Sequence, residues 1–285
     1  MRKSNPYWLG VFIILAVVPL LAGLIYALLY SLGLVGVLGK GFTLQHWTAI
    51  LGKGEVWVSI GYSLGIGIVS IGLAGLLALA LVLRYPTALG KGFPGLSRYL
   101  PLCIPPIAAG FFSFQFLGRS GWLSRLCYQL GFIENQQAFP EFIQDKFAIG
   151  VILTHVMLAL PFFLLLLGSL YSRLGIPAFL EQGKSLGASA KALRRKIAAP
   201  LLLRAAFPTF VLYTLFVTGA YEIPLLLGRQ SPQMISVLTV RYLRHYDLQL
   251  IPQAYIVAII YAVLMLLTLV LTYRWLVPPS QSART

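Results

Sequence analysis

The sequence predicts an all-α membrane protein, a single domain of residues 1–285 that crosses the bilayer with about six helices. Of its 285 residues, 59% are hydrophobic and only 10% are charged, and the mean hydropathy is +0.85. Soluble domains carry roughly 25% charged residues, because a globule in water must present a polar surface. A spanning helix needs about 20 mostly apolar residues, and runs of that length are too long for barrel strands.

Six apolar runs follow one another along the chain. They cover about residues 7–30, 56–83, 99–117, 147–171, 205–227 and 253–273. The first run follows Arg2 and Lys3, as the core of a secretory signal does. It is longer than such a core, and no clear cleavage site comes after it. We therefore expect an uncleaved first helix.

Two of the runs hold more than one proline, a residue that breaks helices. The third holds Pro101, Pro105 and Pro106, and the fifth holds Pro208 and Pro224. Because proline removes a backbone hydrogen bond from a helix, we expect the third run to be kinked or interrupted. Such breaks either lie beside a translocation path or serve packing, and the sequence leaves both interpretations open.

The distribution of lysine and arginine predicts the orientation. With the N-terminus inside, the inner loops carry 14 basic residues and one acid, and the outer side carries 8 basic residues and six acids. This bias predicts that both termini are inside. The inner basic residues are Arg2, Lys3, Arg84, Lys91, Arg98, Arg173, Lys184, Lys191, Arg194, Arg195, Lys196, Arg204, Arg274 and Arg284.

The net charge of +15 also occurs in nucleic-acid binders. Here the charges lie in alternate loops instead of on one soluble face, so we expect contact with lipid phosphates and no nucleic acid. Cys103 and Cys127 form no CxxC motif and have no nearby histidine pair. We therefore predict neither a metal site nor a disulfide framework.

The inner loop of residues 173–204 is more structured than a connector needs to be. Its sequence predicts two short helices, because Pro177 suits a first helical turn, Gly187 allows a turn, and Ser189 can cap a second helix. Pro200 then marks the entry to the next apolar run. The exposed apolar residues expected in this loop indicate a docking surface for a soluble partner.

The loop resembles the signature of binding-protein-dependent ABC importer permeases: Glu-Ala-Ala, three residues, Gly, nine residues, Ile, one residue, Leu-Pro. Glu181 is followed by Gly187 at the required offset, then by Ile197 and Pro200. The departures are Gln182 and Gly183 for the two alanines and Ala199 for the leucine.

This resemblance implies the type I ABC importer permease fold, with a core of about residues 56–273. It implies that the loop is a coupling helix in a groove of the ATP-hydrolysing subunit, with Glu181, Leu186, Gly187 and Ala188 at the contact. The implied partners are two ATPase subunits, a second permease (itself or a sister chain) and an external solute-binding protein. Residues 117–146 are expected to hold a short surface helix that helps receive the latter. The implied location is the bacterial inner membrane.

Gly183-Lys184-Ser185 resembles the end of a phosphate-binding loop. The full pattern needs glycine at position 178, where this chain has Ala178, and no strand precedes it. We therefore expect no cofactor and no catalysis in this chain, with ATP bound by a separate subunit. The segment Gly219–Gly228 resembles the fifth-helix motif of the polyamine, ferric iron, thiamine and aminophosphonate branch, which implies a cationic, metal or phosphonate-type solute.

Four residues are candidates for the solute path. Glu222 is either a path-lining carboxylate that attracts a cation or an interfacial acid paired with Arg229. His155 is either a solute ligand or hydrogen-bonded to a neighbouring helix. Tyr213 and Tyr221 either line the path or serve as packing and interfacial anchors.

Two other classes of protein are weaker alternatives. If the chain were an ion-gradient-driven secondary transporter, we would expect buried ionisable residues in several helices and an internal repeat. A membrane enzyme needs a cluster of His, Asp or Glu at the membrane face. The three histidines are scattered at positions 46, 155 and 245, and neither alternative explains the spacing in the loop.

Overall fold

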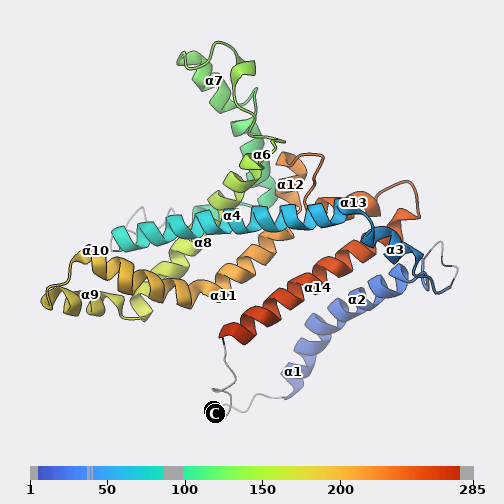
Figure 1. Ribbon diagram of the computed structural model, residues 1–285, viewed down its shortest axis with the longest axis horizontal. Coiled ribbons are helices and arrows are strands. Elements are labelled where there is room, and N and C mark those ends of the chain that lie inside the picture. Colours follow the sequence, from blue (N-terminus) through green and yellow to red (C-terminus); the bar gives the residue numbers. More distant parts are fainter. Residues whose placement is uncertain (1–5, 37–38, 40, 87–98, 277–285) are drawn as a thin grey trace. The chain divides into compact units, whose positions relative to one another are not determined.

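The computed structural model describes residues 6–36, 39, 41–86 and 99–276, and within these ranges it is built from helices with no β-strand (Figure 1). The predicted all-α fold class is therefore confirmed. Several basic residues used to predict the orientation lie outside the described residues: Arg2, Lys3, Lys40, Lys91, Arg98 and Arg284.

Five helices in the described ranges are long and apolar enough to cross a membrane. They correspond to the first, second, fourth, fifth and sixth predicted runs. They are built from α1 (Pro6–Phe12), the π-helical turn η1 (Ile13–Val17) and α2 (Val18–Ser31); α4 (Gly54–Arg84); α8 (Ile149–Arg173); α10 (Ala190–Leu193), the π-helical turn η4 (Arg194–Ala198) and α11 (Ala199–Thr218); and α14 (Leu250–Leu276).

The third predicted run is interrupted, as its prolines indicate. A 3-10 turn, η2 (Leu100–Cys103), is followed by Ile104, which has extended backbone. Pro105 is also extended, and α6 (Pro106–Leu117) begins after it. At 1.5 Å per residue, the 12 residues of α6 reach about 18 Å, less than the roughly 30 Å of a hydrocarbon core. The count of six spanning helices is therefore not confirmed.

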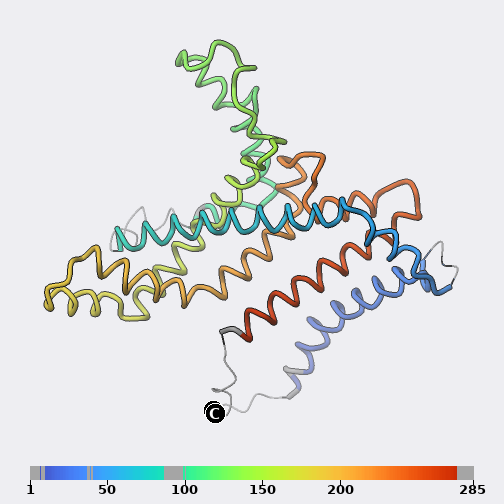
Figure 2. Tube along the Cα trace, in the orientation of Figure 1, coloured from blue at the N-terminus to red at the C-terminus, as the bar shows by residue number. Residues whose placement is uncertain are grey.

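The fifth predicted run has the wrong boundaries. The helix begins at Ala190, well before residue 205, and it ends at Thr218, where Gly219 forms the C-cap. A short break precedes α12 (Glu222–Leu227), and the chain turns there (Figure 2). Hydropathy did not indicate that the helix begins at Ala190, because the basic residues of the loop interrupt the apolar pattern without interrupting the helix.

The chain divides into two compact units. The first comprises residues 1–60 and 235–268 and includes α3 (Gln45–Leu51) and α13 (Ile235–Leu243). In it the rings of Tyr30 and Tyr255 lie 4.7 Å apart. The carboxylate of Glu55 accepts hydrogen bonds from Arg241 and, at 3.0 Å, from the Tyr242 hydroxyl. Burial and this bond to Glu55 raise the pKa of Tyr242, which keeps its hydroxyl a donor.

The second unit comprises residues 61–234 and 269–285. Its larger apolar core joins α4, α8 and α11 around Phe163, Leu167 and Leu202, all fully buried. A smaller core joins α4, α8 and α12 through Ile66, Val151 and other residues. The predicted short surface helix is α7 (Trp122–Gln129), in the segment that extends beyond α6 (Figure 1).

Two glycines of α4 allow α11 to approach closely. A Cβ added to Gly75 would lie 2.2 Å from the ring of Phe210, and one added to Gly67 would lie 3.1 Å from the backbone oxygen of Thr214. The ring of Phe210 in turn stacks on Phe163, with centroids 4.5 Å apart. These contacts hold α4, α8 and α11 together, and the candidate loop joins α8 to α11.

Candidate functional site

The loop of residues 173–204, which is predicted to lie inside, contains the two short helices that the sequence predicts. The first, α9 (Ile176–Ser185), follows Gly175, whose φ of +63° lets the chain leave α8, and it has Pro177 in its first turn. Ile176 is fully buried in the larger core and anchors the start of α9. The second helix, α10, has Ser189 as its N-cap, and the Ser189 hydroxyl accepts a hydrogen bond from the Ala192 N–H.

Gly187 forms the turn between the two helices. Its φ is +85°, a left-handed conformation that favours glycine. The Gly187 N–H donates to the Lys184 carbonyl at 2.9 Å, and the Ala188 N–H donates to the Gly183 carbonyl at 3.0 Å. These two bonds form a Schellman cap, which satisfies carbonyls that the end of α9 would otherwise leave unpaired.

The packing around Gly183 explains why this chain departs from the signature at that position. A Cβ at this position would lie 2.4 Å from the Cδ2 methyl of Leu193, which is 5% exposed. The signature has alanine here, and this chain has glycine with a leucine packed over it. Gly183 and Leu193 together therefore hold α9 against α10.

Most of the other signature positions face outward. Glu181, Gln182, Leu186, Gly187 and Ala188 are all exposed, and Leu186 is 87% exposed. Of its last three positions, Ile197 and Pro200 are also exposed, and Ala199 is half-buried. Leu186 therefore presents an apolar side chain to the solvent at the tip of a capped helix.

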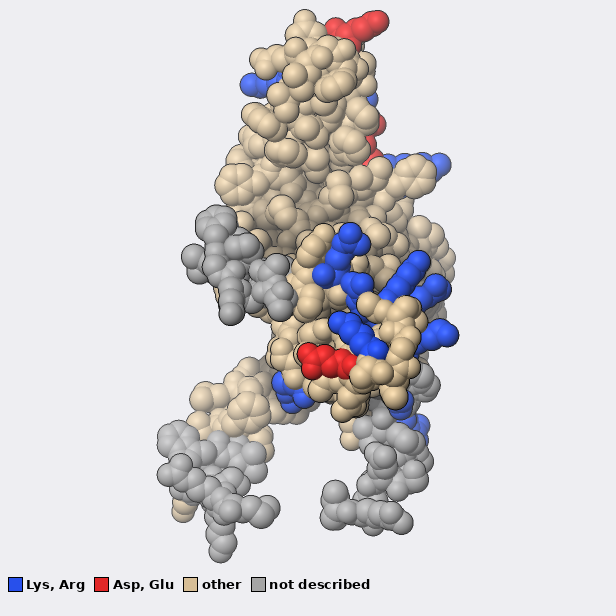
Figure 3. Space-filling model, turned by 90° about the vertical axis from the view of Figure 1, so that its left-hand side faces the viewer, with Lys and Arg blue, Asp and Glu red and all other residues tan. Residues whose placement is uncertain are grey.

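Basic side chains surround this tip. Figure 3 shows them gathered on one face of the molecule with a single acidic group among them. The exposed basic residues of the two helices and the π turn are Lys184, Lys191, Arg195 and Lys196, and Glu181 is the one acid between residues 173 and 204.

The four candidates for the solute path lie in different settings. Glu222 is exposed in the first turn of α12, directly after the half-buried Tyr221. Among the described residues, no ion pair joins Glu222 to Arg229. The Tyr213 ring packs on Phe162 and Phe163, at 5.0 and 5.4 Å, in the larger core.

His155 lies in the interior of the second unit, with 4% of its surface exposed. Its Nδ1 donates to the Val151 carbonyl one turn earlier in α8, at 2.8 Å, so this bond is within its own helix and not to a neighbouring one. Its Nε2 has no hydrogen-bond partner in the described part of the chain. The path roles of these four residues stay predictions.

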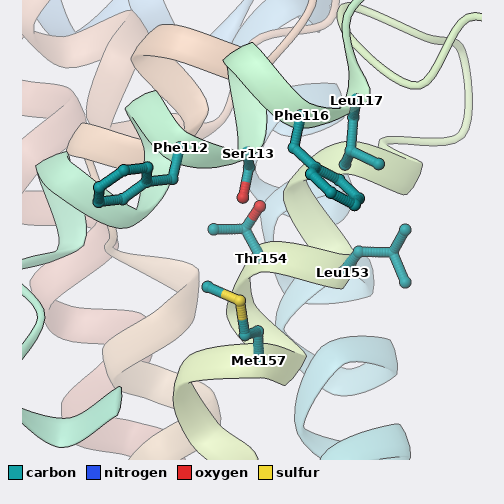
Figure 4. A pocket seen from close by; sticks show the side chains of 7 residues that line it. All are labelled: Phe112, Ser113, Phe116, Leu117, Leu153, Thr154 and Met157. Atoms are coloured by element: carbon teal, nitrogen blue, oxygen red, sulfur yellow. The ribbon is translucent and has the colours of Figure 1, made fainter. Parts of the chain in front are cut away.

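A cavity of about 430 Å³ lies between α6 and α8, and the sequence gives no signal for it. Its walls are mostly apolar, and the Ser113 and Thr154 hydroxyls point toward one another within it (Figure 4). The Thr154 hydroxyl donates to the Gly150 carbonyl at 2.7 Å. The lining residues are Phe112, Ser113, Phe116, Leu117, Leu153, Thr154 and Met157, none of which is charged.

The fold is that of ABC importer permeases. The chain matches one chain of a bacterial alginate ABC transporter, crystallised with an alginate pentasaccharide-bound periplasmic protein, with a TM-score of 0.70 and 17% identity over 93% of this chain and 91% of that one. A second match is to a bacterial ABC transporter that imports the acidic polysaccharide alginate, with a TM-score of 0.70 and 16% identity over 94% and 91% of the two chains.

In sequence, the chain is 28% identical over 255 residues to the probable ABC transporter permease protein y4fN of Sinorhizobium fredii. The match covers 85% of this chain and 42% of that relative, so the chain spans less than half of the relative's length. No protein-family model matches the sequence.

The comparisons confirm the predicted resemblance to ABC importer permeases and the predicted location, a multi-pass protein of the inner membrane. They do not identify a branch of these permeases.

Proposed function

We propose that this chain is the channel-forming permease subunit of an ATP-driven, binding-protein-dependent importer of a small solute. The observation that carries the proposal is the exposed α9–Gly187–α10 unit, which has the signature spacing, a Schellman cap and an outward-facing leucine. A separate ATPase subunit holds this unit in a groove, and closure of two such subunits on ATP switches the path between its inward- and outward-facing states. This chain performs no catalysis and binds no ATP.

The remaining partners are a second permease and an external solute-binding protein. The relative from Sinorhizobium is more than twice as long as the stretch it shares with this chain, which leaves room for a second module of this size. That supports pairing of this chain with itself or with a sister chain. The periplasmic protein in the alginate transporter supports an external binding protein here.

For the solute, we propose a small cation of the polyamine type, or a metal or phosphonate-type solute. Glu222 supports a cation, because it is an exposed carboxylate with no ion pair among the described residues. The faces of Phe112 and Phe116 in the uncharged cavity can also attract a cation that has shed its water.

The test is gentle isolation of the tagged chain from its native membrane, followed by identification of the proteins that remain attached. We expect an ATPase subunit and, in reconstituted vesicles, uptake that needs ATP and the binding protein. Glu181→Lys should abolish that uptake while leaving the amount of chain in the membrane unchanged. Uptake driven by an ion gradient without ATP would instead identify a secondary transporter and contradict the proposal.

A further inference from the structure

Arg194 makes a contact that connects two distant parts of the second unit. Its side chain is half-buried, and its Nη1 donates to the Leu83 carbonyl at 3.4 Å, 111 residues away in sequence. Its Nε donates at 3.2 Å to the carbonyl of Ala190, one turn earlier in α10. The planar guanidinium thus bridges the second helix of the loop and the inner end of α4.

The Leu83 carbonyl is well suited to receive this cation. It lies in the last turn of α4, where carbonyls have no partner within the helix and the helix dipole is negative. The surroundings are packed, because Val82, Ala198 and Leu202 belong to the same apolar core and are 2% exposed or less. The contact is therefore held between two rigid elements.

Arg194 is also the first residue of the π-helical turn η4. The N–H of Ala199 donates to the Arg194 carbonyl, five residues back. The wider turn lets Leu193 and Ala198 both be buried although they are five residues apart. Single π turns inside α-helices occur frequently at functional sites. The helix runs without a break from Ala190 to Thr218, so α10 and η4 are continuous with α11.

From this geometry we infer that Arg194 is a positioning residue that fixes the coupling loop to α4. The inference rests on the proposed function. When the ATPase subunits displace the α9–Gly187–α10 unit, the continuous helix carries the movement to α11, and Arg194 carries it to the inner end of α4. Two spanning helices then respond together to one docking event.

The chain offers a matched control. Arg195 has the same charge and is the next residue in the same π turn. Its side chain is exposed, and no hydrogen bond or ion pair of that side chain is seen among the described residues. Arg194→Gln and Arg195→Gln each remove one positive charge, so lipid attraction and net charge change equally. Only Arg194→Gln breaks the bond to α4, and Arg194→Lys keeps a charged donor without the planar fork.

The experiment measures the complete complex in vesicles: retained ATPase subunit, ATP hydrolysis, and solute taken up per ATP hydrolysed. We expect Arg194→Gln to retain the ATPase subunit and to lower uptake per ATP by about fivefold or more, the lower end of ordinary coupling between sites. Arg194→Lys should recover part of the loss, and Arg195→Gln should keep the wild-type uptake per ATP, a ratio that does not depend on how much ATPase subunit is docked.

A distance measurement provides a second readout. Spin labels at Tyr85 and Lys191, in a chain whose Cys103 and Cys127 are serine, report the separation of the end of α4 and the loop. We expect this separation to stay fixed between nucleotide-free and ATP-bound wild type, and to change with nucleotide in Arg194→Gln. Equal behaviour of Arg194→Gln and Arg195→Gln, or loss of the ATPase subunit in Arg194→Gln, would overturn the inference. Absence of the ATPase subunit from the wild-type complex would instead count against the proposed function.

Discussion

Replacing Gly187 should uncouple transport without harming membrane insertion. Gly187 adopts a φ of +85°, and a Cβ built on it meets no atom within 4 Å. A larger residue at position 187 is therefore disfavoured by the left-handed backbone conformation and not by a steric clash. The left-handed conformation costs a residue with a Cβ about 1–2 kcal/mol, most severely when the side chain is β-branched.

This cost determines the expected size of the effect. A change of about 1–2 kcal/mol alters an equilibrium by a factor of about 5–30. In Gly187→Val the ratio of loops with the native turn to loops with an altered turn should fall by about that factor, since both Schellman hydrogen bonds depend on the turn. Gly187→Asn is the matched control, because asparagine tolerates the left-handed region far better than other residues do.

The assay compares solute uptake and binding-protein-stimulated ATP hydrolysis in vesicles that hold equal amounts of each complex. We expect Gly187→Val to lose both activities in proportion to the missing native turn, and Gly187→Asn to stay close to wild type. Wild-type transport by Gly187→Val would refute the idea that this turn transmits the movement. Equal loss in the asparagine variant would show that the backbone conformation is not the reason.

Three further predictions concern packing, charge and topology. Gly183→Ala should weaken the contact of α9 with α10 and lower the melting temperature of the complex, and trimming Leu193 to valine should recover part of the loss, because the crowding is with its methyl groups. Glu222→Gln should reduce uptake of a cationic solute while assembly and basal ATP hydrolysis stay unchanged. Cysteines introduced at Ser189 and Gln136 should react with an impermeant reagent from opposite sides of the membrane.

Each of these measurements has a control and a contradicting outcome. If Leu193→Val does not relieve Gly183→Ala, the two side chains do not determine the packing. Glu134→Gln, another exposed outer carboxylate, should leave uptake unchanged, and normal uptake by Glu222→Gln would assign Glu222 a structural role. Cys103 and Cys127 are first replaced by serine for labelling, and labelling of both positions from one side would exclude the predicted topology.

Local chemistry in the loop was predictable from the sequence. A glycine followed by a serine before a basic stretch indicates a turn and an N-cap, and the structure has both, at Gly187 and Ser189. The interruption of the third run was predictable because it holds three prolines within six residues, each without the N–H that a helix interior uses. These features depend on one residue and its backbone, so the sequence contains the information directly.

Features that depend on distant contacts were not predictable. The helix that ends at Thr218 begins in the basic loop, because the burial of Leu193 and Ala198 decides its start more than hydropathy does. The packing of Gly183 under Leu193 and the bond from Arg194 to Leu83 each join residues whose proximity follows from the fold. The cavity between α6 and α8 gives no signal either, because its apolar lining looks like any spanning helix.

The central claim is that the tip of this loop docks on an ATPase subunit. Leu186, which is 87% exposed, is the residue to test. A cysteine placed at Leu186, in the chain without its native cysteines, should form a cross-link to the co-purified ATPase subunit, and a cysteine at Tyr128 in α7 should not. A Leu186 cysteine that cross-links to no ATPase subunit, in a complex that still contains one, would contradict the account.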